Sequence, residues 1–358
     1  MIQPGLSNRL IHDITHRGIS AWVLSFLLFA FYLDLYFTEH LAVIAQAIGL
    51  DGKWTLYGLL YSLAIVTGGI FVLRKYRHDR YQVVRTIVVM VVQVTFGFSI
   101  PQLLKFFQQP EFYFSYFWPL KIDYLNPSYL FSLPLPYILY TFFATLLAVP
   151  ILGAFFGKRW YCSWVCGCGG LANTAGDPFR QLSDKSSTAW KFERIAIYSV
   201  FAISILLTCL MFISWGTKGQ YPDLVGITNQ FQSAYGLWVG AILSGAIGVG
   251  LYPLGGTRVW CRNFCPMAAL LGLTQKFGRF RIAVKENMCI SCGLCSHNCE
   301  MGIDVRSYAQ SNTSFVRASC VGCGICAEVC PRGVLRLENV TQRDPQERAL
   351  VQIQTAHS

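Results

Sequence analysis

The sequence has little charge for its length. Asp, Glu, Lys and Arg make up only 13% of its 358 residues, whereas soluble domains carry about 25%. Apolar residues make up 54% of the chain. A chain with so few charged residues cannot form a polar surface around several soluble domains. The composition therefore predicts an integral membrane protein with a smaller polar part.

Histidines in apolar segments and nucleotide-binding motifs are also missing. All six histidines lie at the ends of the long apolar segments, in loops or in the tail, so a haem held by two histidines within the membrane is not expected. No glycine-rich dinucleotide fingerprint follows a predicted strand, and no motif pairs a nucleophile with a base. These absences argue against a haem-based, a dinucleotide-dependent and a nucleophilic enzyme.

Long apolar runs define the membrane part. Each run is about 20 residues long, which is the length that a helix needs to cross a bilayer. The first run is predicted to stay as an anchor, because it carries Asp34 and no small-residue cleavage site follows it. Segment 102–135 is rich in proline and aromatic residues and is predicted to lie at the outer membrane surface. The six predicted spans are 19–37, 54–73, 83–101, 136–157, 195–214 and 234–254.

The two sides of these spans differ in basic residues. Only four of the 29 lysines and arginines lie in segments 38–53, 102–135 and 215–233. Basic loops favour the cytoplasm, so we expect a multi-pass protein of the bacterial inner membrane with both termini and the C-terminal domain in the cytoplasm. The net charge of +11 is attributed to this topology and to contact with membrane lipid, and no nucleic-acid partner is expected.

Two internal repeats organise the chain. KRWYCSWVC (158–166) matches TRVWCRNFC (257–265), and CISCGLCSHNC (289–299) matches CVGCGICAEVC (320–330). The first pair predicts duplicated membrane hairpins and the second a duplicated half-domain. The fold class is therefore a membrane all-α six-helix domain plus a small α+β two-cluster ferredoxin-like domain. The predicted parts are an N-terminal two-helix segment (1–82), the duplicated hairpins (83–280), the ferredoxin-like domain (281–340, with strands at 281–284, 314–317 and 335–338) and a tail (341–358).

The two cysteine runs of the C-terminal domain have the spacing C-x2-C-x2-C-x3-C. In two-cluster ferredoxins the fourth cysteine of each run ligates the other cluster. A zinc ribbon is the alternative, but zinc sites use paired C-x2-C knuckles with four ligands per ion. Two [4Fe-4S] clusters are therefore expected. Their predicted ligands are Cys289, Cys292, Cys295 and Cys330 for one cluster, and Cys299, Cys320, Cys323 and Cys326 for the other.

The C-x3-C motifs behind the membrane hairpins provide four more thiols, Cys162, Cys166, Cys261 and Cys265. Each motif would place its two cysteines about one helical turn apart, and both emerge on the cytoplasmic side. They could hold a third iron–sulfur centre, with Cys168 as an alternative ligand or a neighbour, or they could be reduced, packed thiols or a reversible dithiol. Flanking basic residues would favour an anionic centre, although topology alone also predicts them.

Together these motifs resemble a family, the membrane polyferredoxins of the NapH/NosR type. The resemblance covers residues 85–340 and rests on CSWVC (162–166), CRNFCP (261–266) and the two ferredoxin runs. It implies an electron-transfer subunit that exchanges electrons between the quinone pool or a membrane partner and other redox subunits. The alternatives are an assembly factor that reduces a metal for a respiratory enzyme and a structural anchor of a redox complex. Cys166 is followed by Gly167 and Cys168 where the family has proline.

A quinone site is a further expectation. Asp34, Glu39 and His40 lie at the outer end of the first span, and quinol oxidation must release protons. The alternative is that these groups lie near the interface, where water solvates carboxylates.

Overall fold

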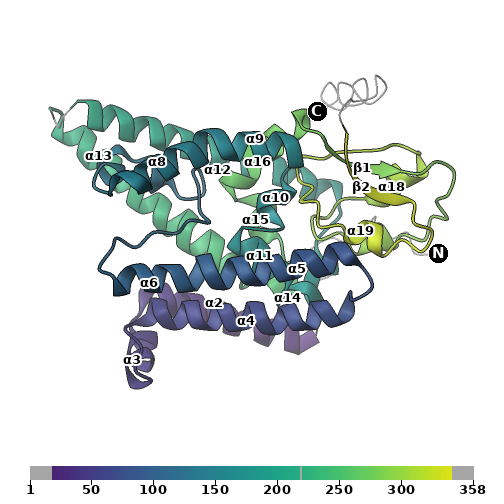
Figure 1. Ribbon diagram of the computed structural model, residues 1–358, viewed down its shortest axis with the longest axis horizontal. Helices are drawn as coiled ribbons and strands as arrows, with labels where there is room; N and C mark the ends of the chain where they lie inside the picture. The colour runs from purple at the N-terminus through teal and green to yellow at the C-terminus, as the bar shows by residue number, and fades with distance from the viewer. Residues whose placement is uncertain (1–17, 218–219, 341–358) are drawn as a thin grey trace.

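A bundle of long helices forms the larger part of the molecule (Figure 1). The computed structural model describes residues 18–217 and 220–340. Five continuous helices in these ranges are long and apolar enough to cross a membrane, and they confirm five of the six predicted spans. The five are α2 (Gly18–Phe37); α4 (Lys53–Lys75); α5 (Arg80–Val92), continued by η1 (Gln93–Ser99) and α6 (Ile100–Phe106); α8 (Leu135–Phe143), continued by η3 (Ala144–Ala148) and α9 (Val149–Phe156); and α12 (Ser187–Gly216).

The sixth predicted span, 234–254, is not among these five, so the count of six is not confirmed. The chain there forms α13 (Pro222–Tyr235), followed without a break by the π-helix η5 (Gly236–Ile247). This helix begins earlier than expected, in a polar stretch that lowers its mean hydropathy. η5 packs against α2, where a Cβ atom at Gly245 would lie 2.7 Å from the Tyr32 ring.

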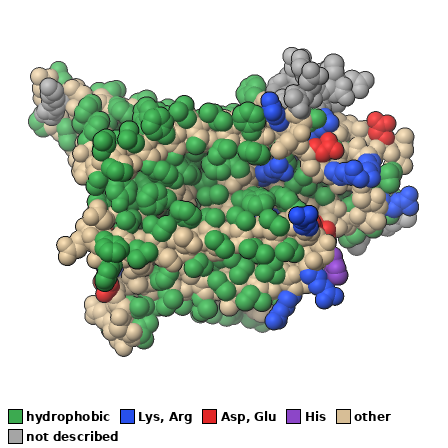
Figure 2. Space-filling model, in the orientation of Figure 1, with side chains coloured by type: hydrophobic (Ala, Val, Ile, Leu, Met, Phe, Trp, Pro, Cys, Tyr) green, Lys and Arg blue, Asp and Glu red, His purple; other side chains and the backbone are tan. Residues whose placement is uncertain are grey.

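The bundle has an apolar surface and polar residues inside. Figure 2 shows hydrophobic side chains across the face formed by the helices. Phe26, Leu63 and Ile195 are all more than half exposed, whereas Gln82 and Arg85 on α5 are buried. This distribution is the one expected where lipid covers the surface and polar groups find partners within the protein.

Residues 107–134 link α6 to α8 and fold back into the bundle. Tyr161 donates a hydrogen bond to the Ser115 carbonyl at 2.9 Å, and the ring of Phe117 packs against Tyr161. The prediction that this segment lies at the membrane surface therefore does not hold for its middle, where Phe112, Ser115 and Phe117 are buried in the protein. Its non-helical backbone is tolerated because protein surrounds it. The segment contains η2 (Ile122–Leu125) and α7 (Pro127–Leu130), and α3 (His40–Ala47) links α2 to α4.

The two C-x3-C motifs share one backbone structure. Each follows a glycine with positive φ, Gly157 at 68° and Gly256 at 86°. In each motif the first cysteine lies in a short helix, and the second is the N-cap of the next helix. The two cysteines thus do not share one continuous helix as the spacing predicted. The helices are α10 (Arg159–Cys162) and α11 (Gly167–Asn173) in the first motif, and α15 (Val259–Asn263) and α16 (Pro266–Phe277), preceded by α14 (Tyr252–Gly255), in the second.

The ferredoxin-like part packs on one end of the bundle (Figure 1). Its antiparallel strands β1 (Phe280–Val284) and β2 (Leu335–Asn339) confirm two of the three predicted strands. The third, at 314–317, is reduced to a single bridge between Phe315 and Ile282. The Phe315 ring instead stacks on Tyr308 at 4.2 Å between centroids. Three short helices complete this part, namely α17 (Leu294–His297), α18 (Val305–Gln310) and α19 (Ile325–Glu328). The predicted tail, 341–358, lies outside the described residues.

Candidate iron–sulfur site

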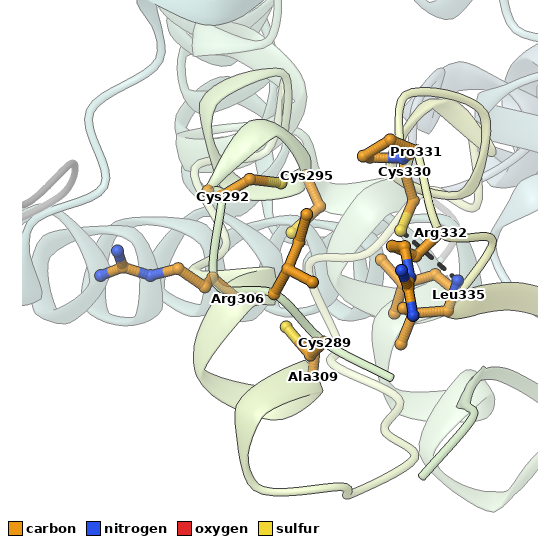
Figure 3. A pocket seen from close by; sticks show the side chains of 12 residues that line it. Cys289, Cys292, Cys295, Arg306, Ala309, Cys330, Pro331, Arg332 and Leu335 are labelled. Atoms are coloured by element: carbon orange, nitrogen blue, oxygen red, sulfur yellow. Dashed lines mark hydrogen bonds between the residues drawn. The ribbon is translucent and has the colours of Figure 1, made fainter. Parts of the chain in front are cut away.

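The first group of ferredoxin cysteines, here called the solvent-side set, lines one hollow. Figure 3 shows three of its cysteines on one side of this hollow and the fourth, Cys330, on the other. The Cys330 sulfur accepts a hydrogen bond from the Val334 N–H at 3.4 Å. Burial, together with the nearby thiols of Cys292 and Cys330, raises the pKa of the Cys295 thiol to about 11. The set is Cys289, Cys292, Cys295 and Cys330.

The second group, the bundle-side set, lies against the helices. Burial raises the pKa of the Cys326 thiol, and the thiols of Cys323, Cys320 and Cys299 add to the rise. Cys299 thus lies with the cysteines of the other run. This arrangement is compatible with the crossed ligation that the spacing predicted, and the ligation itself stays a prediction. The set is Cys299, Cys320, Cys323 and Cys326.

The two runs follow the same backbone path. Gly293 and Gly324, with φ of 79° and 81°, each begin a short helix that carries the third cysteine of its run. Ser291 and Gly322 also correspond, with φ of 59° and 60°. Glycine adopts such values at little cost, and the sharp turns bring the cysteines of a run together.

The thiol sets fit iron–sulfur clusters better than a single metal ion. Four-iron clusters are held by four cysteine thiolates, and each set supplies four sulfurs from two segments. Within residues 18–217 and 220–340, no group of three or more His, Cys, Asp or Glu side chains is arranged to hold one ion.

The four cysteines of the C-x3-C motifs, here called the bundle-end quartet, also converge. All four are buried and belong to one hydrophobic core. Burial raises the pKa of the Cys265 thiol, and the thiols of Cys261, Cys166 and Cys162 raise it further. Thiols from both hairpins therefore lie near one another.

Cys168 lies beside this quartet. A hydrogen bond from its thiol lowers the pKa of Cys166 to about 7. Cys168 thus lies beside a quartet sulfur, and its two predicted roles, alternative ligand or neighbour, stay predictions.

Several flanking basic residues are buried in the interior. Lys158 donates to the Ala318 carbonyl at 3.1 Å, and a guanidinium nitrogen of Arg258 lies 3.8 Å from the Cys261 sulfur. Arg262 forms an ion pair with Glu193 at 2.7 Å. Contacts of these buried residues join the ferredoxin-like part to the motifs. The positive-inside rule alone requires only that basic residues lie on the cytoplasmic side, and it does not require such contacts.

Sequence reasoning missed three other buried charges, Arg85, Arg180 and Glu300. Arg85 donates to the Cys323 carbonyl at 2.6 Å, and Glu300 accepts from Arg258 at 2.9 Å. Arg85 falls inside the predicted span 83–101. A charge within an apolar segment is a functional signal, and it could have pointed to this site.

The residues expected to form a quinone site lie at the turn between α2 and α3. The Asp34 carboxylate contacts His40 Nδ1 at 2.7 Å and accepts from the Leu41 N–H at 3.2 Å. Glu39 instead forms an ion pair with Lys53 at 2.8 Å. The structure thus brings Asp34 and His40 together, while Glu39 binds the start of α4.

Two sequence families match the chain over these same regions. The family described as "4Fe-4S dicluster domain" matches residues 282–337, which contain both ferredoxin runs. The family described as "4Fe-4S binding domain" matches twice, over residues 137–186 and 237–285. Each of these two matches contains one C-x3-C motif and its preceding helix.

Curated relatives resemble about half of this chain. An uncharacterized protein of Methanocaldococcus jannaschii is 28% identical over 171 residues, 47% of this chain and 61% of that protein. The methylamine utilization ferredoxin-type protein MauN of Methylobacillus flagellatus is 30% identical over 40% of this chain and 49% of its own length. The regulatory protein NosR of Stutzerimonas stutzeri is 23% identical over 47% of this chain and 22% of its own length. The aligned part thus spans less than two thirds of each relative, and no solved structure matches the chain.

The thiol geometry and these matches define an iron–sulfur protein with ferredoxin-type 4Fe-4S domains and two [4Fe-4S] clusters. The chain is, more particularly, a relative of the membrane polyferredoxins of the NapH/NosR type.

Proposed function

We propose that this protein relays electrons between the membrane and a partner in the cytoplasm through three iron–sulfur centres. The observation that carries the proposal is the position of the bundle-end quartet, which shares one hydrophobic core with both ferredoxin sets. Clusters held by the two ferredoxin sets would supply one-electron carriers, and the quartet would hold the third. Contacts made by the chain's own residues support an order for the three sites.

The bundle-side set is the middle site. Ser163, next to Cys162, donates to the Val321 carbonyl at 2.7 Å. The Gln275 amide donates to the Cys320 carbonyl at 3.0 Å. These bonds hold the second cysteine run against the first C-x3-C motif and against α16, the helix that follows the second motif.

The solvent-side set is the outlet toward a soluble partner. Cys292 is exposed, and so is Ile290 on the rim of the hollow. Arg306 and Arg332 line the same hollow, and none of its lining residues is acidic. An electron carrier with an acidic face fits this surface by charge.

The quartet fits a third iron–sulfur centre. Its thiols come from duplicated hairpins, and a 4Fe-4S family matches both copies. Burial raises the pKa of the Cys261 thiol, and two nearby cations, Arg258 and Lys158, offset part of this rise. These observations support a ligated centre over packed, reduced thiols.

The proposal also includes the membrane topology of the chain, with six spans. α13 and η5 act as the sixth span, because η5 packs along α2 within the bundle. Lysines and arginines gather around the ferredoxin-like part in the view of Figure 2, which favours the cytoplasm for this end. Electrons enter from a quinone or a membrane partner at the bundle.

Metal analysis of the full-length protein tests the three-centre relay. Three four-iron clusters correspond to about 12 iron atoms per chain. A Cys162→Ser, Cys265→Ser double variant should retain about 8, with matching loss of acid-labile sulfide. Cys209→Ser is the matched control, since Cys209 is exposed on α12, and it should retain all the iron. If the double variant keeps the iron and sulfide of the unaltered protein, the quartet holds no cluster.

A further inference from the structure

A group of buried cations separates the bundle-end quartet from the bundle-side set. Its members are all 1% exposed or less. They come from segments distant in sequence, including α5 and η4 (Asp177–Leu182). We call this group the buried cation cluster, and it consists of Lys158, Arg85, Arg180 and Arg258.

Carboxylates balance only part of this charge. Asp177 contacts Arg180 at 2.8 Å but also Lys75 at 2.6 Å. Glu300 contacts Arg258 at 2.9 Å and lies 3.8 Å from Arg180. Both carboxylates are fully buried, so two carboxylates serve four buried cations and the half-exposed Lys75.

Several guanidinium N–H groups also have no hydrogen-bond acceptor among the described residues. They are Nε and Nη2 of Arg85, Nη1 and Nη2 of Arg180, and Nε of Arg258. Burying a cation without an anion or an acceptor is strongly unfavourable. The fold therefore requires a further source of negative charge at this place.

The cysteines are the groups that can supply it. Arg85 reaches the Cys323 carbonyl at 2.6 Å. Arg258 reaches the Cys162 carbonyl at 3.2 Å and the Cys261 sulfur at 3.8 Å. Four thiolates make a ligated cluster anionic, and each electron that it accepts adds one negative charge, which nearby cations stabilise.

Among the described residues, the solvent-side set has no equivalent group of buried cations. Of its two arginines, Arg332 is exposed, and Figure 3 shows the Arg306 guanidinium pointing away from the cysteines. Water and salt screen charges at such a surface. The two ferredoxin sets thus differ in the fixed positive charge around them, although their backbones match.

We propose that the buried cation cluster makes the bundle-side cluster easier to reduce than the solvent-side cluster, so that an electron on the ferredoxin-like part rests next to the membrane. Arg85, Arg180 and Arg258 are the positioning residues, and Glu300 partly offsets them. The inference rests on the two ferredoxin clusters and on their place in the proposed relay.

Redox titration followed by EPR on the full-length protein tests this inference. Arg85→Gln should lower the midpoint potential of the bundle-side cluster, and Glu300→Gln should raise it. Each change should shift the electron distribution between the two clusters at least tenfold, which is 59 mV for one electron. Cys330→Ser assigns the signal of the solvent-side cluster, and that signal should keep its potential in both charge variants.

Matched variants separate charge from folding. Arg85→Lys keeps the cation and should restore the potential, whereas Arg332→Gln should leave the bundle-side potential unchanged. Opposite shifts from Arg85→Gln and Glu300→Gln cannot arise from general loosening of the fold. If both signals are present but the bundle-side potential stays constant, or shifts the same way in both variants, the inference is wrong. Absence of two cluster signals in the unaltered protein would instead overturn the proposed function.

Discussion

The two cysteine runs of the ferredoxin-like part have the same backbone and opposite surroundings. In the first run, Ile290 is 58% exposed, whereas its counterpart Val321 is 1% exposed. Helix α5 covers the second run, where Tyr81 donates to the Gly322 carbonyl at 2.9 Å and Gln82 donates to that of Cys323 at the same distance. A duplicated motif has thus become one surface site and one interior site through the elements packed on it.

The same comparison explains a difference in sequence. Ser291 and Gly322 occupy equivalent positions with positive φ. A Cβ atom at Gly322 would lie 2.7 Å from Arg159 and 3.0 Å from the Phe280 ring. Glycine is needed in the second run because the bundle approaches it, whereas solvent leaves room for serine in the first.

The largest effect is expected from Cys299→Ala. Cys299 belongs to the first run but lies with the second set, so the variant should lose the bundle-side cluster and keep the solvent-side cluster. EPR of the reduced protein measures both signals. Cys292→Ala and Cys330→Ala are the controls, and each should remove the other signal. Loss of the same signal in Cys299→Ala and Cys292→Ala would show that the ligation is not crossed.

A smaller effect is expected at the glycine that faces the bundle. Gly322→Ala should destabilise the protein by about 1–3 kcal/mol, because it combines backbone strain with a close contact. Thermal unfolding of the purified protein in detergent, followed by the cluster absorbance, provides the measurement. Ser291→Ala is the matched control and should have the smaller effect. Equal destabilisation by the two variants would mean that packing by the bundle does not distinguish the runs.

Charge reversal at the solvent-side hollow should slow exchange with an acidic electron carrier. Arg332→Glu should reduce the second-order rate about tenfold at low ionic strength and less at high ionic strength, because salt screens surface charge. Stopped-flow reduction by an acidic ferredoxin measures this rate. Arg336→Glu is the control, since Arg336 is exposed but does not line the hollow. The outlet lies elsewhere if the two variants behave alike.

The smallest effect is expected at the opposite end of the bundle. An Asp34→Asn, Glu39→Gln double variant should slow quinol-dependent reduction of the clusters if protons leave through this turn. Both carboxylates already have partners in His40 and Lys53, and such exposed pairs contribute only about 0–1 kcal/mol, so the fold should persist. Unchanged quinol-dependent reduction, with normal iron content, would remove the quinone site from this turn.

Local features of the fold could be predicted from sequence, and long-range contacts could not. The cysteine spacing predicted the crossed sets because four ligands must surround each cluster. The repeat of 158–166 and 257–265 predicted equivalent hairpins. Segment 102–135 was misplaced because aromatic residues at a membrane surface and in a packed interior have the same composition.

The charges around the site show the same limit. Arg85, Arg180 and Glu300 are far apart in sequence and meet only when η4, α5 and the first cysteine run pack together. No rule about sequence spacing predicts that these three residues contact one another. The strand expected at 314–317 shortened for a similar reason, since Phe315 stacks on Tyr308 rather than extending the sheet.

The bonds from Ser163 and Gln275 to the second cysteine run bear on how such chains can be recombined. The carbonyls of Val321 and Cys320 find their donors on the membrane hairpins. A ferredoxin of another origin, grafted after residue 280, would present different backbone positions to these donors and to Arg85. Exchange of the C-terminal half should therefore succeed only in chimaeras that also take α5 and both C-x3-C motifs from the same source protein as the ferredoxin. The two halves are thus expected to be inherited as one unit.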